Sequence, residues 1–125
     1  MFVKQPEDFH PYWMEVFNSG NFEAAIDLFE TEATFVAQPG QVIRGKEAIG
    51  QALKGFFTMN ARLELQKKVL VKSANLALLI SDWTLVSSDN SLLLTGETAD
   101  VLHRQDGGNW LLAIDNPYGS QGLAQ

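Results

Sequence analysis

The sequence predicts an α+β fold in which N-terminal helices pack on one face of a curved antiparallel sheet. In three segments that end by position 57, hydrophobic residues recur with the helical period of about 3.6 residues. After Met59 the period changes to two, which is typical of half-buried strands. Helices that precede a run of strands indicate the α+β class, and short links between strands make neighbours antiparallel.

Two helices are expected first. Pro6, followed by Glu7 and Asp8, is a typical helix start, because proline suits the first turn and acids suit the positive end of the helix dipole. The apolar stripe that follows consists of Phe9, Tyr12, Trp13, Val16 and Phe17. Gly20 is expected to end this helix in a left-handed conformation. Asn21 can cap a second helix, with one apolar face made of Phe22, Ala25, Ile26 and Phe29.

A short hairpin and a third helix come next. Residues 33–37 form a short strand-like run, residues 38–40 turn, and Val42 and Ile43 can return as a second short strand. A helix should then begin at about Lys46. Its apolar face would consist of Ile49, Ala52, Leu53, Phe56 and Phe57.

Four strands complete the chain. The first alternates charged residues with an apolar face of Leu63, Leu65, Val69 and Val71. Strands over 76–86, 92–104 and 110–114 follow. The Asp-Gly-Gly sequence at 106–108 indicates the last hairpin turn.

Composition limits the classes of function. The 125 residues suit one domain, 1–125, and hydrophobic residues at 46% with charged residues at 19% indicate a globular chain. A net charge of −6 argues against a nucleic-acid partner, which needs a basic surface. The absence of cysteine excludes thiolate nucleophiles and thiolate zinc sites. No apolar run approaches the roughly 20 residues of a membrane helix and no signal-peptide pattern is present, so we expect a cytoplasmic protein that does not enter membranes.

Three patterns associated with chemistry are set aside. Residues 40–47, GQVIRGKE, begin like a phosphate-binding loop, but Glu47 stands where serine or threonine must bind magnesium. His10 and His103 are the only histidines, and nothing in their spacing brings them together around a metal. No G-x-S-x-G sequence supports a Ser-His-Asp triad. We therefore expect no metal and no cofactor.

Asp100 is the principal candidate residue, because aspartate is disfavoured in the middle of a strand. On an unbroken strand it shares an apolar face with Leu92, Leu94, Thr98 and Leu102. Gly96 could instead mark a β-bulge, which would reverse the parity before it. Asp100 is thus either a buried acid with a chemical role, or a side chain that faces water or bonds a neighbouring backbone group and has no chemical role. Burial without a cationic partner would favour its protonated form.

Two segments carry a resemblance to a known family. Residues 17–49 contain a helix, a Gly-Asn pair, a second helix, a short strand, a Pro-Gly loop and a G-x-x-A-I helix start. Residues 96–119 contain a closing hairpin with a tryptophan after the glycine turn and a terminal D-N-P-Y-G. In this order the chain resembles the nuclear transport factor 2-like superfamily, in its SnoaL-like and ketosteroid isomerase-like branch. The resemblance implies a cystatin-like α+β cone with a conical pocket, and a homodimer.

The resemblance also implies roles for particular residues. Asp100 falls on the position of a strand aspartic acid that ketosteroid isomerases keep protonated to donate a hydrogen bond to a substrate oxyanion. The positions of their helix tyrosine and loop aspartate base fall on Trp13 and Gln38. Trp13 offers only an N–H group, and a glutamine amide does not exchange a proton near neutral pH. The isomerase mechanism therefore lacks its usual base here.

The remaining candidates each have two interpretations. Trp13 and Phe17 line the cavity or belong to the core, and Trp83 is a core residue or a cavity wall. Asp82 is expected to be solvated or at an interface. Residues of one parity after the last turn could form the opposite wall: Ile114, Asn116 and Tyr118. Alternatively, Asp115 and Asn116 only stabilise the turn into Pro117.

We therefore expect a protein that binds a small, mostly apolar molecule, with Asp100 as the polar anchor and with a pocket lined by Trp13, Phe17, Gln38, Trp83, Thr98, Ile114, Asn116 and Tyr118. Catalysis, if present, would be metal-free and cofactor-free acid–base chemistry of the isomerase, cyclase or dehydratase kind. Two alternatives stay open: a non-catalytic ligand carrier, and an interaction module that dimerises through its sheet.

Overall fold

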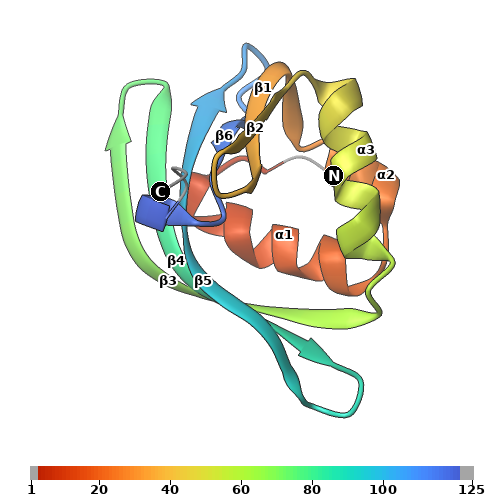
Figure 1. The fold of residues 1–125 in the computed structure, drawn as a ribbon. Helices are drawn as coiled ribbons and strands as arrows, with labels where there is room; N and C mark the ends of the chain where they lie inside the picture. Colours follow the sequence, from red (N-terminus) through yellow and green to blue (C-terminus); the bar gives the residue numbers. More distant parts are fainter. Residues whose placement is uncertain (1–2, 122–125) are drawn as a thin grey trace.

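The computed structural model describes residues 3–121, and within them six strands form one curved sheet with helices on its concave side (Figure 1). The strands run in the order β2-β1-β6-β5-β4-β3. Their bounds are Phe29–Gln38 for β1, Gln41–Arg44 for β2, Ala61–Ser73 for β3, Leu76–Ser87 for β4, Leu92–Arg104 for β5 and Trp110–Asp115 for β6. The helices are α1, Phe9–Asn18; α2, Phe22–Ile26; and α3, Lys46–Phe57. The predicted α+β class with helices packed on a curved sheet is confirmed.

The ends of the helices follow the local signals in the sequence. Pro6 begins a short 3₁₀ turn, Pro6–Asp8, that leads into α1. Gly20, with φ +73°, ends the first helical segment in the left-handed conformation that glycine favours. The side-chain oxygen of Asn21 accepts a hydrogen bond from the Ala24 N–H at 3.1 Å, so Asn21 caps α2 as predicted.

The second helix is shorter than its apolar spacing predicts. It ends at Ile26, and Phe29, which was expected on its face, is instead the first residue of β1. The Leu112 N–H donates to the Leu28 carbonyl at 2.8 Å, and Phe29 pairs with Leu112 in a parallel ladder between β1 and β6. Pairing with the last strand therefore overrides the helical pattern, and β1 begins four residues before the predicted position 33.

A β-bulge changes the buried face of β3. The register with β4 shifts between Lys67 and Val69. Beyond this shift Leu70 packs against the core, whereas Val69 and Val71 are 38% and 55% exposed. The prediction that both valines share a buried face with Leu63 and Leu65 is therefore wrong, because one inserted residue reverses the alternation.

The bulge considered at Gly96 is absent. Gly96 lies directly opposite Trp83 in an unbroken stretch of the β4–β5 ladder. The register of this ladder shifts instead near the hairpin tip, between the partners of Leu85 and Val86. Thr98, Asp100 and Leu102 therefore share one buried face, whereas Leu92 and Leu94 at the far end of the strand are exposed.

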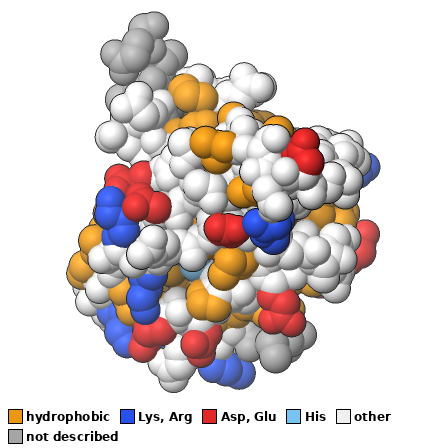
Figure 2. Space-filling model, turned by 90° about the horizontal axis from the view of Figure 1, so that it is seen from below, with side chains coloured by type: hydrophobic (Ala, Val, Ile, Leu, Met, Phe, Trp, Pro, Cys, Tyr) orange, Lys and Arg blue, Asp and Glu red, His pale blue; other side chains and the backbone are white. Residues whose placement is uncertain are grey.

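The interior contains two adjoining groups of buried side chains. The larger group joins α1, α3 and the sheet and includes Phe9, Phe29, Phe35, Ile49 and Leu79. The smaller group, Leu63, Trp83 and Leu85, packs against Trp13, Phe17 and Phe56. On the surface seen from below in Figure 2, hydrophobic side chains lie between acidic and basic ones. Within residues 3–121, no helix is long and apolar enough to span a bilayer.

Candidate functional site

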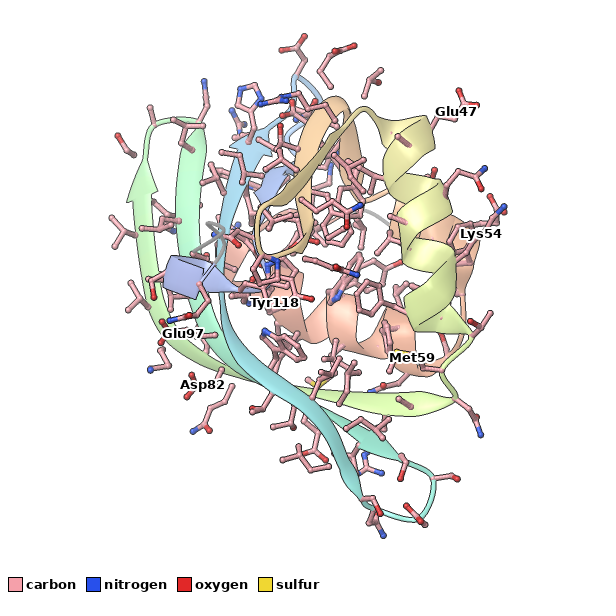
Figure 3. All side chains as sticks on the ribbon, in the orientation of Figure 1. Glu47, Lys54, Met59, Asp82, Glu97 and Tyr118 are labelled. Carbon is pink, nitrogen blue, oxygen red and sulfur yellow. The ribbon has the colours of Figure 1, made fainter. Side chains whose placement is uncertain are left out.

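A cavity lies between α1, α3 and the concave face of the sheet. Its volume is about 90 Å³. Most of its lining is apolar, with aromatic rings from Phe9, Trp13, Phe17, Phe35, Phe56, Trp83 and Tyr118. The polar part of the lining consists of His10, Thr98, Asp100 and Asp115. Figure 3 shows Tyr118 in the hollow between sheet and helices, whereas Asp82 and Glu97 lie on the outer side of the sheet.

Asp100 is buried at the polar part of this lining and is surrounded by hydrogen-bond donors. Its Oδ1 accepts from the Thr98 hydroxyl at 2.6 Å and from the Asn116 backbone N–H at 3.0 Å. Its Oδ2 lies 2.7 Å from Nε2 of His10. Each oxygen of the Asp100 carboxyl group therefore has a hydrogen-bond partner within the protein. The role that the resemblance implies for Asp100, donation of a hydrogen bond to a substrate oxyanion, stays a prediction.

His10 is the partner that orients Asp100. It lies on the first turn of α1, is 4% exposed, and has Nδ1 2.7 Å from the Ser81 hydroxyl. An ionised Asp100 only accepts, so Nε2 carries the proton and donates to Asp100. In the neutral ring Nδ1 then accepts from the Ser81 O–H. This assignment satisfies both nitrogens of the imidazole ring within the protein.

Ser81, His10 and Asp100 do not form a nucleophilic triad, although all three side chains are in one chain of hydrogen bonds. Ser81 is fully buried and is absent from the cavity lining. A nucleophile has to reach a substrate atom, and this hydroxyl faces the histidine instead. Ser81 is therefore a residue that fixes the tautomer and orientation of His10.

Asp115 is a second carboxyl group in the cavity lining. It is 8% exposed. Burial raises the pKa of Asp115 well above its ordinary value, and the charge of Asp100 and a side-chain hydrogen bond with Asp100 raise it further. The interior therefore favours the protonated form of Asp115 more than water does.

A bulge in β6 turns Asp115 inward. Val101 pairs with Ile114 and Leu102 pairs with Leu112, so Ala113 is an extra residue in β6. Leu112 and Asp115 consequently both face the interior, and Ile114 is 41% exposed. The predicted wall of Ile114, Asn116 and Tyr118 assumed unbroken alternation and is wrong for Ile114.

The structure brings most of the other predicted residues together. Trp13, Phe17, Trp83, Thr98, Asp100 and Tyr118 all line the cavity. Gln38 is exposed at the end of β1 and Asn116 is outside the lining, although its backbone N–H holds Asp100. Direct contact of these side chains with a ligand stays a prediction.

Sequence reasoning missed His10 and the inward position of Asp115. The signal for His10 was available, since positions 10, 13 and 17 lie on one face of a helix. No sequence signal indicated the bulge at Ala113. The other histidine, His103, has a different partner: its Nδ1 lies 2.8 Å from a carboxylate oxygen of Glu30.

The architecture and the cavity place the protein in a known class. Helices packed on a curved six-stranded sheet are the cystatin-like, nuclear transport factor 2-like α+β fold. Residues 12–111 match the model of the SnoaL-like domain, and the chain belongs to that family. The resemblance inferred from the sequence is thereby confirmed. No curated protein sequence matches the chain.

Several solved structures share the fold at low sequence identity. A candidate calcium/calmodulin-dependent protein kinase type II association domain from Thiobacillus denitrificans is 13% identical, with a TM-score of 0.79 over 93% of this chain and 95% of that one. A candidate dehydratase of the nuclear transport factor 2-like family from Streptomyces avermitilis is 16% identical, with a TM-score of 0.75 over 90% and 91%. A protein of unknown function with a cystatin-like fold from Nostoc punctiforme is 15% identical, with a TM-score of 0.74 over 87% and 84%.

Proposed function

We propose that the cavity binds a small, mostly apolar molecule with one carbonyl or hydroxyl group, and that Asp115 and Asp100 transfer a proton on it. The observation that supports this proposal is the position of the two carboxyl groups in the lining of an otherwise apolar cavity. A cavity with few polar groups among aromatic walls is typical of small-molecule sites. The family includes ligand-binding proteins and isomerase- or dehydratase-like enzymes, and the fold shared with a candidate dehydratase agrees with this class.

The volume sets the size of the ligand. A bound water needs about 10–15 Å³ of such space, so a cavity of about 90 Å³ suits a molecule of on the order of ten non-hydrogen atoms. The aromatic walls favour a flat apolar body. The carboxyl groups then fix the polar end, because a buried polar group that lacks a partner is costly.

The carboxyl pair can serve as both acid and base. The protonated carboxyl donates a hydrogen bond to a carbonyl oxygen, and the ionised carboxyl accepts a proton from the adjacent carbon. The carbon–hydrogen electron pair forms a carbon–carbon double bond, the π pair of the carbonyl moves to its oxygen, and that oxygen takes the donated proton to give an enol. Return of a proton to carbon completes an isomerisation. The loop aspartate base of the ketosteroid isomerases is replaced in this scheme by the Asp100–Asp115 pair.

Binding is tested with tryptophan fluorescence, because Trp13 and Trp83 line the cavity. We expect 2-naphthol to bind more tightly than naphthalene by about fivefold, which corresponds to one net hydrogen bond of about 1 kcal/mol. Asp115→Asn should keep this preference, because an amide still donates a hydrogen bond. Asp115→Leu should abolish it.

Proton transfer is tested with 2-tetralone in heavy water. We expect the protein to accelerate deuterium incorporation at the carbon beside the carbonyl. Asp115→Asn should lose this acceleration, because an amide does not exchange a proton at neutral pH. The matched control is Asp82→Asn, which removes a carboxylate from the outer face. Binding without exchange would support the ligand-carrier alternative, and the absence of both would contradict the proposal.

We also propose that the protein is a homodimer that associates through the outer face of the sheet. Apolar residues lie directly opposite one another across four strands on this face: Val71, Leu78, Val101 and Ile114. The adjacent row contains Val69, Ile80 and Ala99. Exposed apolar rows of this kind are typical of interfaces. At one end Lys68 lies 2.7 Å from Glu97 and 3.5 Å from Asp82, which gives the face a charged rim.

A further inference from the structure

Gly96 lies at a point of very close approach between strand β5 and a side chain of the cavity wall. It pairs with Trp83 in the β4–β5 ladder. A Cβ atom at Gly96 would lie 2.9 Å from both Cε2 and Cζ2 of the Trp83 indole. Contacts this short do not occur in folded proteins, so only glycine leaves room for the indole in this position.

The Trp83 indole is also held by the C-terminal turn. Its Nε1–H donates to the Pro117 carbonyl at 2.6 Å, and its ring meets the Tyr118 ring edge-on. The Tyr118 hydroxyl donates in turn to the Ala37 carbonyl of β1 at 3.2 Å. Trp83, Pro117 and Tyr118 all line the cavity, so they form one continuous wall that starts at Gly96.

We infer that Gly96 is a specificity-determining residue, which sets the largest ligand that the cavity accepts by letting the Trp83 indole lie against β5. This inference rests on the proposed binding function. Gly96 itself is outside the cavity lining and acts through Trp83.

A methyl group added at Gly96 would displace either the backbone of β5 or the Trp83 indole. The backbone of β5 is held on both sides of Gly96 by its pairing with β4, from Leu94 to Leu102. The indole is the movable partner, and it can retreat only away from β5, toward the cavity. Gly96→Ala therefore narrows the cavity and stretches the hydrogen bond to Pro117.

The test compares phenol and 2-naphthol, which share a hydroxyl group and differ by one ring. We expect Gly96→Ala to weaken the binding of 2-naphthol by about tenfold, which is the usual effect of a methyl group in a tight apolar site. The affinity for phenol should stay nearly unchanged. The Trp83→Phe variant should bind both phenol and 2-naphthol. The double variant should recover 2-naphthol binding, because the phenyl ring lacks the indole atoms that meet the new methyl group. Gly55→Ala is the control, since a Cβ there meets nothing within 4 Å.

A second measurement detects a change in the position of the Trp83 indole in the absence of a ligand. The indole N–H resonance of Trp83, identified by its loss in Trp83→Phe, should move in Gly96→Ala and stay in place in Gly55→Ala. An unmoved resonance, or an equal loss of affinity for both probes, would overturn the inference. If the unaltered protein binds neither probe, the binding function fails, and the indole resonance alone then decides whether Gly96 positions Trp83.

Discussion

Asp115 is a carboxyl group that the fold holds among apolar side chains and next to a second carboxyl group. Its pKa is raised well above the ordinary value, chiefly by burial and then by Asp100. Between about pH 4 and this raised pKa, the unfolded chain releases the Asp115 proton while the folded chain keeps it. The folded state then binds more protons, so the free energy of unfolding falls as pH rises, by up to about 1.4 kcal/mol per pH unit.

Asp115→Asn should remove this pH dependence. The amide has a similar shape and can still donate to Asp100, but it does not titrate. We therefore expect the free energy of unfolding of the variant, minus that of the unaltered protein, to increase from about pH 4 to about pH 7. Urea denaturation at several pH values measures this difference, and the subtraction cancels the contributions of other groups. A difference that is constant with pH would contradict the neutral state of Asp115.

His10 is predicted to matter for stability as well as for the site. His10→Ala leaves Oδ2 of Asp100 and the Ser81 hydroxyl without their buried imidazole partner, which should lower the free energy of unfolding by about 3 kcal/mol. His103→Ala is the matched control, because its contact with Glu30 is partly exposed and should contribute less than about 1 kcal/mol. Denaturant midpoints measure both changes. Equal effects of the two substitutions would show that the His10 contacts contribute little.

The residues of the site were partly predictable from the sequence. Asp100 was found because an acid in an apolar strand violates local preference. Asp115 was placed at a turn, and its inward orientation depends on one extra residue, Ala113, whose effect is visible only in the pairing of β6 with β5. The partner of Asp100 is 90 positions away in the chain, and contacts of that range leave no local pattern.

Among the helices and strands, the end of α1 is joined to the edge strand of the sheet by two hydrogen bonds of one side chain. Strand β3 is at the edge of the sheet. The side-chain amide of Asn18, at the end of α1, forms hydrogen bonds with the free backbone edge of this strand. Its Nδ2–H donates to the Leu63 carbonyl at 2.9 Å, and its Oδ1 accepts from the Leu63 N–H at 2.7 Å. Since α1 carries His10, Trp13 and Phe17, this contact helps to fix one wall of the cavity.

Asn18→Ala should therefore destabilise the protein by about 1–3 kcal/mol, because it leaves two partly buried backbone groups unpaired. Asn18→Asp is the informative companion, since it keeps the acceptor and loses the donor. Its cost should lie between those of the alanine variant and the unaltered chain. Hydrogen exchange of the Leu63 amide should rise in the alanine variant and not in the aspartate variant. An unchanged rate in both would mean that Asn18 does not hold β3.

The elements were predicted where their signals are local. The caps at Gly20 and Asn21 and the start of α3 near Lys46 follow from single residues with known preferences. The parallel pairing of β1 with β6 was not predicted, because it joins segments far apart in the chain. For the same reason, Phe29 was assigned to a helix although it belongs to a strand. Local spacing does not report which distant strand will pair with a segment.

In the molecule as a whole, the two faces of the sheet differ in what covers them. The helices cover the concave face (Figure 1). The cavity lies on that side, and the outer face presents the apolar rows that contain Val71 and Leu78. We expect Leu78→Lys to convert the proposed dimer to a monomer, because a charge would be buried in the interface. Leu92→Lys, at the exposed β4–β5 hairpin, should leave the dimer intact. Light scattering at micromolar concentration measures both masses. A monomeric mass for the unaltered protein would rule out the dimer.

In the proposed function, a protonated Asp115 carboxyl group lines an apolar cavity and meets the polar end of a ligand there. The most direct test is carbon-13 NMR of the Asp115 carboxyl, assigned by its loss in Asp115→Asn, over a pH titration with and without 2-tetralone. We predict a titration midpoint well above that of an ordinary aspartate and a change in chemical shift when 2-tetralone is added. A midpoint in the ordinary range, with no response to 2-tetralone, would contradict the claim.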